Sequence, residues 1–266
     1  MPMLSHRTTL NLHVREAIEK SFEFTSNHYV KVIKNMLSLF SDPKLKTLLD
    51  RLHAQSDAQI AETDAYCARL EREQDGPVDW RTFDDSMHDF FADKLVALDR
   101  DKAEFCYQLC RSLGACLVVE AGTSYGVSTL YLAAAVRDNT TKSSSVKKGT
   151  VIATESNPAK AATARANFEE AGLSEFIELR EGDLRQTLQN VGGEVDFMLV
   201  DIWEVARSAL ELVSPYLRKG AIVVCDNTTV DIAEYQDYFA FVNDPQNRFS
   251  TMTLPFHGGF ELTVRL

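Results

Sequence analysis

The sequence predicts an α/β fold, a doubly wound and mostly parallel sheet preceded by a helical extension. Three observations predict it. From Leu117 onward, short apolar runs alternate with segments of helical periodicity, which is typical of a parallel sheet with helices on both faces. A glycine turn, Gly122 to Gly126, joins the first apolar run to a helix. Before residue 99, every periodic segment has helical spacing.

The N-terminal part of the chain carries helical patterns only. Residues 1 to about 25 have little pattern, and apolar spacing then predicts helices over 29–40, 84–98 and 101–113. Another helix is predicted from Asp42-Pro43 to a stop at 75–77, and its polar middle, 53–63, suggests a bend or a split. We therefore divide the chain into a helical extension, 1–98, and a sheet domain, 99–266. Because the extension cannot close a core alone, it must pack on the domain, on a second copy, or on both. Its apolar stripes favour a homodimer, and a lid over the pocket is the plainer alternative.

The sheet domain contains five predicted strands followed by a hairpin. The strands are 117–120, 151–155, 176–180, 197–201 and 221–226, with helices 158–171, 204–217 and 230–242 between them. The segments 250–255 and 260–266 flank His257-Gly258-Gly259, which predicts a terminal hairpin and an antiparallel strand. Residues 137–149 form a polar stretch, expected to be an exposed insertion.

Composition excludes several classes of function. The 266 residues carry a formal net charge of −11, which argues against a nucleic-acid partner. The polar N-terminus lacks the apolar segment of a signal peptide, and no apolar run is long enough to span a membrane. Five cysteines without a Cys-x-x-Cys pair suggest neither disulfides nor a zinc site. We expect a reducing, cytoplasmic setting.

Polar residues stand where each predicted strand ends. Ligands of open α/β sheets bind beyond the carboxyl ends of the strands, so these residues carry extra weight. Glu120 ends the first strand, and Glu155 ends the second, where a carboxylate can accept hydrogen bonds from a ribose diol. The remaining strand ends carry Gly182-Asp183, Asp201 and Asp226-Asn227. Helix capping is the structural alternative for the Asp and Asn residues.

These strand ends resemble the ordered motifs of a known family. The segments are Val-Val-Glu-Ala-Gly-Thr-Ser-Tyr-Gly-Val-Ser-Thr, Ala-Thr-Glu-Ser-Asn-Pro, Arg-Glu-Gly-Asp, Leu-Val-Asp-Ile-Trp and Val-Val-Cys-Asp-Asn. Together they resemble class I S-adenosylmethionine (SAM)-dependent O-methyltransferases, within them the catechol and caffeoyl-CoA type and its small microbial relatives. The resemblance covers about 99–266 and implies a seven-stranded sheet whose last strand is antiparallel.

The resemblance implies which residues bind the cofactor. Glu155 would hold the ribose hydroxyls, and Gly182 and Asp183 would border the adenine. Asp201 and Trp203 would also face this pocket, with Trp203 forming an aromatic wall beside the substrate. The methionine part of SAM would be lined by residues of the glycine turn, namely Glu120, Gly122, Thr123, Gly126 and Ser128.

The resemblance also implies a divalent metal and a reaction. Asp201, Asp226 and Asn227 match the family's three oxygen ligands, a donor set that suits Mg²⁺. The implied activity is methyl transfer to an oxygen of a small, hydroxylated, aromatic acceptor. The polar insertion 137–149 and the N-terminal arm suggest a role in secondary metabolism. The alternatives are a metal-independent methyltransferase and an inactive methyltransferase-like binding scaffold.

One position departs from the family pattern. The family commonly has a lysine three residues after the first metal aspartate, where it acts as the base, and here that residue is Glu204. A carboxylate can accept a proton, but Glu204 also fits a helix N-terminus. Asp201 and His257 are further candidates for acid–base chemistry, with an exposed loop as the plainer interpretation of His257.

Overall fold

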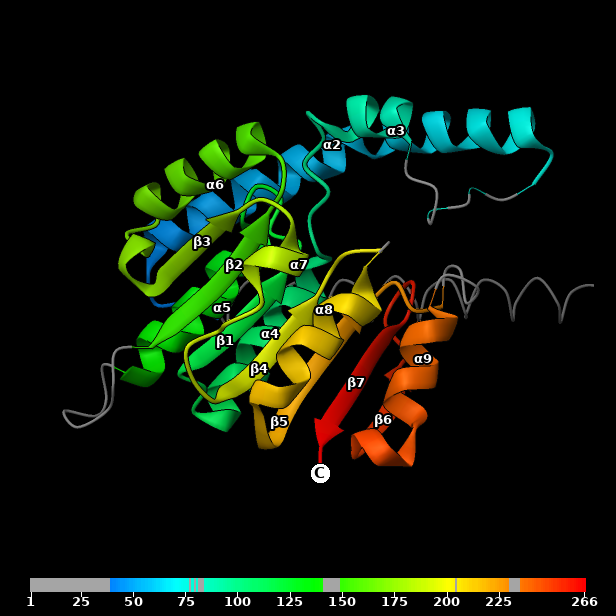
Figure 1. Ribbon diagram of the computed structural model, residues 1–266. Coiled ribbons are helices and arrows are strands. Elements are labelled where there is room, and N and C mark those ends of the chain that lie inside the picture. The colour runs from blue at the N-terminus through cyan, green and yellow to red at the C-terminus, as the bar shows by residue number, and fades with distance from the viewer. Residues whose placement is uncertain are drawn as a thin grey trace, which may run out of the picture. The chain divides into compact units, whose positions relative to one another are not determined.

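The computed structural model describes residues 39–76, 78, 80, 84–140, 149–203, 205–229 and 235–266. The chain divides after Pro43 into two units, and the features below belong to the second, Lys44–Leu266. Its centre is a seven-stranded sheet of order β3-β2-β1-β4-β5-β7-β6 (Figure 1). The strands are β1 (Leu117–Ala121), β2 (Thr150–Glu155), β3 (Ile177–Glu181), β4 (Val195–Val200), β5 (Leu217–Asp226), β6 (Phe249–Leu254) and β7 (Phe260–Arg265).

The first five strands are parallel, and β7 runs antiparallel to both β5 and β6. The predicted doubly wound sheet with an antiparallel last strand is therefore confirmed. The strand order reverses between β1 and β4, so the carboxyl ends of these two strands flank the crevice in which such sheets bind ligands.

Helices cover both faces of the sheet. In Figure 1, α7, α8 and α9 lie on the face toward the viewer and α4 and α5 lie behind it. The helices are α2 (Pro43–Gln74), α3 (Asp85–Phe91), α4 (Arg100–Leu113), α5 (Val127–Thr140), α6 (Pro158–Glu170), α7 (Leu184–Thr187), α8 (Ala206–Val213) and α9 (Gln236–Asn243). Within the described residues, no helix combines the length and the apolar character needed to cross a membrane.

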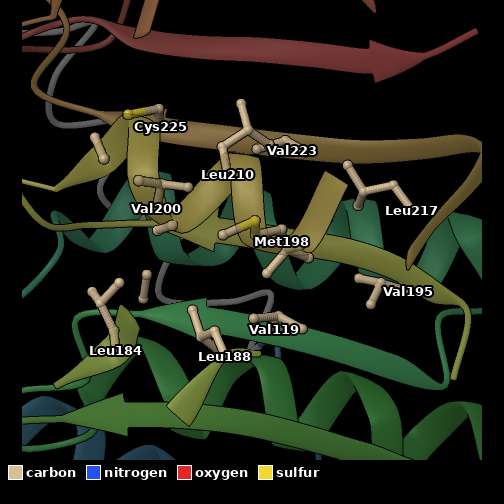
Figure 2. Close-up of a cluster of buried hydrophobic side chains, with 14 of the residues drawn as sticks. Val119, Leu184, Leu188, Val195, Met198, Val200, Leu210, Leu217, Val223 and Cys225 are labelled. Atoms are coloured by element: carbon tan, nitrogen blue, oxygen red, sulfur yellow. The ribbon is translucent and has the colours of Figure 1, made fainter. Parts of the chain in front are cut away.

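The core on the viewer's face is formed by side chains of the central strands and of α7 and α8. Figure 2 shows Val119, Met198 and Val223 from β1, β4 and β5 meeting Leu188 and Leu210, all of them buried. Burial on both faces explains why β1 begins with three consecutive apolar residues and β4 ends with four, rather than alternating with polar ones. This core fixes the strand ends that carry the polar residues.

Three elements differ from the sequence-based expectation. Helix α2 is a single helix of 32 residues, although its polar middle suggested a bend. The helix predicted over 84–98 ends at Phe91, and residues 94–99 are extended. Strand β5 begins at Leu217, because Pro215 belongs to a short 3-10 turn that ends the preceding helix.

The extended segment 94–99 is held by α2 instead of by helical hydrogen bonds. Leu95 N donates to Gln59 Oε1 at 2.8 Å, and Ala97 N donates to Ser56 Oγ at 3.3 Å. Leu95 and Leu98 are buried, at 2% and 3% exposure. Helix α2 packs on the sheet domain of its own chain, because Arg51 pairs with Glu170 of α6 at 2.5 Å and His53 Nε2 lies 3.1 Å from the Tyr131 hydroxyl of α5. The boundary at residue 98/99 and the homodimer stay predictions.

Candidate active site

The turn after β1 depends on two glycines with positive φ. Gly122 has φ +95°, and a Cβ there would lie 2.0 Å from the backbone oxygen of Asp201. Gly126 has φ +84°, and a Cβ there would lie 2.3 Å from the ring of Phe168. Both glycines therefore permit close packing of neighbouring elements, β1 against β4 and the start of α5 against α6.

Glu120 lies behind this turn and is fully buried. Its Oε2 accepts hydrogen bonds from the hydroxyls of Thr123, at 2.9 Å, and of Thr129. Burial raises the pKa of Glu120, and hydrogen bonds from Ser128, Thr129 and Thr123 oppose that rise. In this structure Glu120 organises the turn from inside, and its contact with a cofactor stays a prediction.

Glu155 at the end of β2 points into a cavity and is held by two backbone donors. Oε2 accepts a hydrogen bond from Ser124 N at 2.8 Å, and Oε1 accepts one from Asn157 N at 2.7 Å. Asn157 in turn caps α6 through its side-chain oxygen. A carboxylate has about four acceptor positions, so two remain for a ligand. The glycine turn and the second strand end thus orient this carboxylate jointly.

Gly182 and Asp183 lie beside this strand end but do not line the cavity. Gly182 N donates to the backbone oxygen of Glu155 at 2.9 Å. Asp183 caps α7 and pairs with Arg185 at 2.8 Å, and hydrogen bonds from Arg185 lower the pKa of the Asp183 carboxyl. Its predicted hydrogen bond to adenine therefore competes with an existing ion pair and stays a prediction.

A cavity of about 240 Å³ brings several predicted residues together. Gly122, Glu155, Asp201 and Trp203 all line it, as the convergence of strand ends predicted. Its lining also includes Phe91 of α3, which the sequence left open between core and substrate pocket, and His88 of α3 and Lys160 of α6, for which the sequence gave no signal. Burial lowers the pKa of Lys160, and the charges of Glu155 and Asp93 oppose this.

The side of the cavity formed by α3 is aromatic. The ring centroid of Trp203 lies 4.6 Å from that of Trp80 and 6.4 Å from that of Phe91. His88 and Phe91 are three residues apart on α3, a spacing that places them on the same face of the helix. The extension therefore supplies one wall of the cavity, and a flat apolar group with one polar atom would fit this wall.

The segment 94–99 narrows the cavity at the glycine turn. A space of only about 10 Å³ is surrounded by residues 95–98, 122–125, 127 and 128 and by Asp201. Thr123 and Ser128, the predicted methionine-side residues, line this space together with Gly122. A ligand that reaches these residues therefore has to displace part of the segment.

An acidic centre, formed by Asp201, Asp226 and Asn227, occupies the ends of β4 and β5. The pKa of Asp201 is held well above its usual range by burial and by the neighbouring charge of Asp226. Asp226 is 5% exposed, and its Oδ1 accepts hydrogen bonds from Lys102 Nζ at 2.6 Å and from Asn227 N at 2.8 Å. Lys102 lies on α4, and the sequence gave no signal for this contact.

The donor chemistry of this centre fits a divalent cation. Two carboxylates and an amide are oxygen donors, which Mg²⁺ prefers, and a cation would relieve the repulsion between Asp201 and Asp226. Lys102 Nζ and Asn227 N both bond to Oδ1 of Asp226, so Oδ2 would be the oxygen that binds such a cation. No group of three His, Cys, Asp or Glu side chains suited to a metal exists in the described part of the chain, so Asn227 would have to complete the set.

Two predicted acid–base candidates are not placed at the cavity. His257 lies in the exposed turn between β6 and β7 and does not line the cavity. Glu204 lies outside the described residues. The polar insertion also falls mostly outside them, at 141–148.

Comparison with known proteins agrees with this architecture. Residues 119–228 match a family model described as a methyltransferase domain. The chain is 28% identical over 134 residues to a catechol O-methyltransferase of Mycobacterium tuberculosis, which spans 50% of this chain and 57% of the relative. A catechol O-methyltransferase of Niastella koreensis is 28% identical over 145 residues, or 51% and 60% of the two chains. The chain thus matches less than two thirds of either relative's length.

Solved structures share the fold. An O-methyltransferase from Bacillus cereus, solved in complex with SAH, superposes with a TM-score of 0.60 at 20% identity, covering 90% of this chain and 97% of the other. The O-methyltransferase TomG from Streptomyces achromogenes, involved in tomaymycin synthesis and solved with SAM, gives 0.60 at 19% identity, covering 89% and 96%. The fold that the resemblance to class I SAM-dependent methyltransferases implied is therefore confirmed.

Proposed function

We propose that this chain transfers a methyl group from SAM to an oxygen of a small hydroxylated aromatic acceptor. The observation that carries the proposal is the cavity in which Glu155, Gly122, Asp201 and Trp203 meet, four residues from three separate strand ends. The names of its relatives, two catechol O-methyltransferases, support oxygen as the methylated atom.

The cofactor half of the cavity fits a nucleoside. Glu155 is pre-oriented by two backbone N–H groups and keeps acceptor capacity for a ribose diol. SAM supplies an electrophilic methyl group when it is bound, so the protein's task is to align the acceptor with it. The methionine end would lie along the glycine turn, which requires segment 94–99 to move from its present position.

The acceptor half is the wall formed by α3 and Trp203. Phe91 and Trp203, whose rings meet edge to face, would hold a planar ring between them. His88, on the same helix face as Phe91, would take the proton of the acceptor hydroxyl, because His is the commonest proton acceptor in enzyme sites. Glu204 stays a second candidate for this role.

The acidic centre is the proposed metal site. Asp201, Asp226 and Asn227 would hold Mg²⁺, which supplies Lewis acidity that makes a bound hydroxyl easier to deprotonate. In the metal-independent alternative, Lys102 already balances part of the acidic charge and no metal is needed.

The test is turnover with SAM and catechol, followed by mass spectrometry of the methylated product and of S-adenosylhomocysteine. We expect product from the purified chain and its loss in EDTA. Product formation that survives EDTA would support the metal-independent enzyme. Absence of both product and cofactor binding would support the inactive scaffold and overturn the proposal.

A further inference from the structure

Lys102 is a buried lysine that touches the acidic centre. Its side chain is 1% exposed, and Nζ lies 2.6 Å from Asp226 Oδ1 and 3.1 Å from Asp99 Oδ2. Nζ also lies 6.0 Å from the ring centroid of Phe260, so its surroundings are partly apolar. A lysine is almost never fully buried unless it is paired, and the pairing here is with a carboxylate at the end of β5.

The two carboxylates of the acidic centre do not share this ammonium equally. Lys102 is bonded to Asp226, whereas Asp201 makes no ion pair within the described residues. Asp99 is half-exposed, and solvent screens its pairing with Lys102 more than it screens the Asp226 contact. The acidic centre therefore has one fixed positive charge, bonded to Asp226, and a second carboxylate, Asp201, that makes no direct ion pair within the described residues.

We propose that Lys102 is a positioning residue that holds Asp226 by one oxygen and, through its fixed positive charge, sets how tightly the acidic centre binds a divalent cation. The inference rests on the same acidic centre as the proposed function. An ammonium bonded to a ligand carboxylate lies within a few ångströms of any cation on its second oxygen, where like-charge repulsion is strong in a buried site. Lys102 thus weakens cation binding while it fixes the direction in which Asp226 faces.

The test is a titration of the folded 266-residue chain with Mn²⁺, followed by calorimetry. Lys102→Met removes the charge and keeps the length of the side chain, and we expect Mn²⁺ affinity to rise at least about tenfold. Lys102→Gln, which can still donate to Asp226, is the second variant in case the first does not fold. Circular dichroism and a melting curve establish folding before each titration.

A matched control comes from the same helix. Arg100→Met removes one positive charge from α4, but Arg100 is half-exposed and pairs with Asp50 on α2, so solvent screens it. We expect its Mn²⁺ affinity to stay within about twofold of the wild type. Asp99→Asn leaves Lys102 less compensated, and we expect weaker binding, opposite in sign to Lys102→Met.

The outcomes separate this inference from the proposed metal. If the wild type binds Mn²⁺ and neither Lys102 variant binds it more tightly, the inference is overturned and the proposed metal site stands. If the wild type shows no binding and a Lys102 variant does, the inference is supported and the metal part of the proposed function fails. If no variant binds Mn²⁺, both are overturned.

Discussion

Replacing Gly122 with Ala tests whether close packing of the glycine turn against the backbone of Asp201 stabilises the fold. The Ala would adopt φ +95°, which costs an L-residue about 1–2 kcal/mol. Its Cβ would also lie 2.0 Å from the Asp201 backbone oxygen, so β1 and β4 must separate locally. Such overpacking costs about 1–3 kcal/mol. We expect the free energy of unfolding to fall by about 2–5 kcal/mol in total.

Gly172→Ala is the matched control for this prediction. Gly172 also has a positive φ, +65°, but a Cβ there would meet nothing within 4 Å. This variant should therefore show the backbone cost alone, about 1–2 kcal/mol. Urea unfolding followed by circular dichroism measures both variants. If Gly122→Ala is no less stable than Gly172→Ala, the contact between the turn and Asp201 does not constrain the fold and the reasoning is wrong.

Three further predictions concern the cavity and the extension. Glu155→Gln should weaken binding of S-adenosylhomocysteine by about tenfold or more in calorimetry, since the hydrogen bonds from the ribose to a charged acceptor are lost. The control, Glu181→Gln at an exposed strand end, should leave this affinity unchanged. Equal affinities of the two variants would contradict the assignment of Glu155 to the ribose. His88→Gln should lower kcat about 100-fold without changing the affinity for the cofactor. The control, Asp89→Asn at an exposed position on the same helix, should leave kcat unchanged. An unchanged kcat in His88→Gln would show that His88 is not the base. Burial lowers the pKa of His53 from 6.5 to about 4. The neutral ring therefore contributes fully to the free energy of unfolding above pH 6.5, and up to about 3 kcal/mol of that stability is lost as the pH falls toward 4. His53→Gln should flatten this part of the pH profile of stability in urea, and parallel profiles for the two proteins would refute the prediction.

The strand ends were predictable because their signals are local. An apolar run that is buried on both faces and then stops at a carboxylate identifies a parallel strand and its carboxyl end together. Glu155 and Asp201 were placed at one cavity on this basis, and the structure has both lining it. The terminal hairpin was also predictable, because Gly258 and Gly259 stand between two short β-patterns. In the structure both glycines have positive φ, as a tight turn requires.

The contacts that complete the site were not predictable, because they join residues far apart in the chain. Lys102 lies 124 residues before Asp226, and a lysine in an amphipathic helix ordinarily faces solvent. His88 and Phe91 carry no motif, and only the fold brings α3 against Trp203. Nothing in the sequence marks the end of α3 at Phe91, because Gln59 and Ser56 of α2 provide the hydrogen bonds that favour the extended segment.

Gly122 has a structural role that the sequence did not reveal. The resemblance implied that this glycine lines the methionine part of the cofactor, which stays a prediction. In the structure the space that a Cβ would need is filled by the Asp201 backbone oxygen, so the glycine is required by strand packing. A motif therefore identified the position, and the geometry identified the physical cause.

The most direct measurement is a crystal structure of the chain with S-adenosylhomocysteine. Convergence of the strand ends on one nucleoside predicts that the ribose hydroxyls donate to Glu155 and that the sulfur lies in the space between Gly122, Asp201 and Trp203. A nucleoside bound anywhere else, or a Glu155 carboxylate without contact to the sugar, would contradict it.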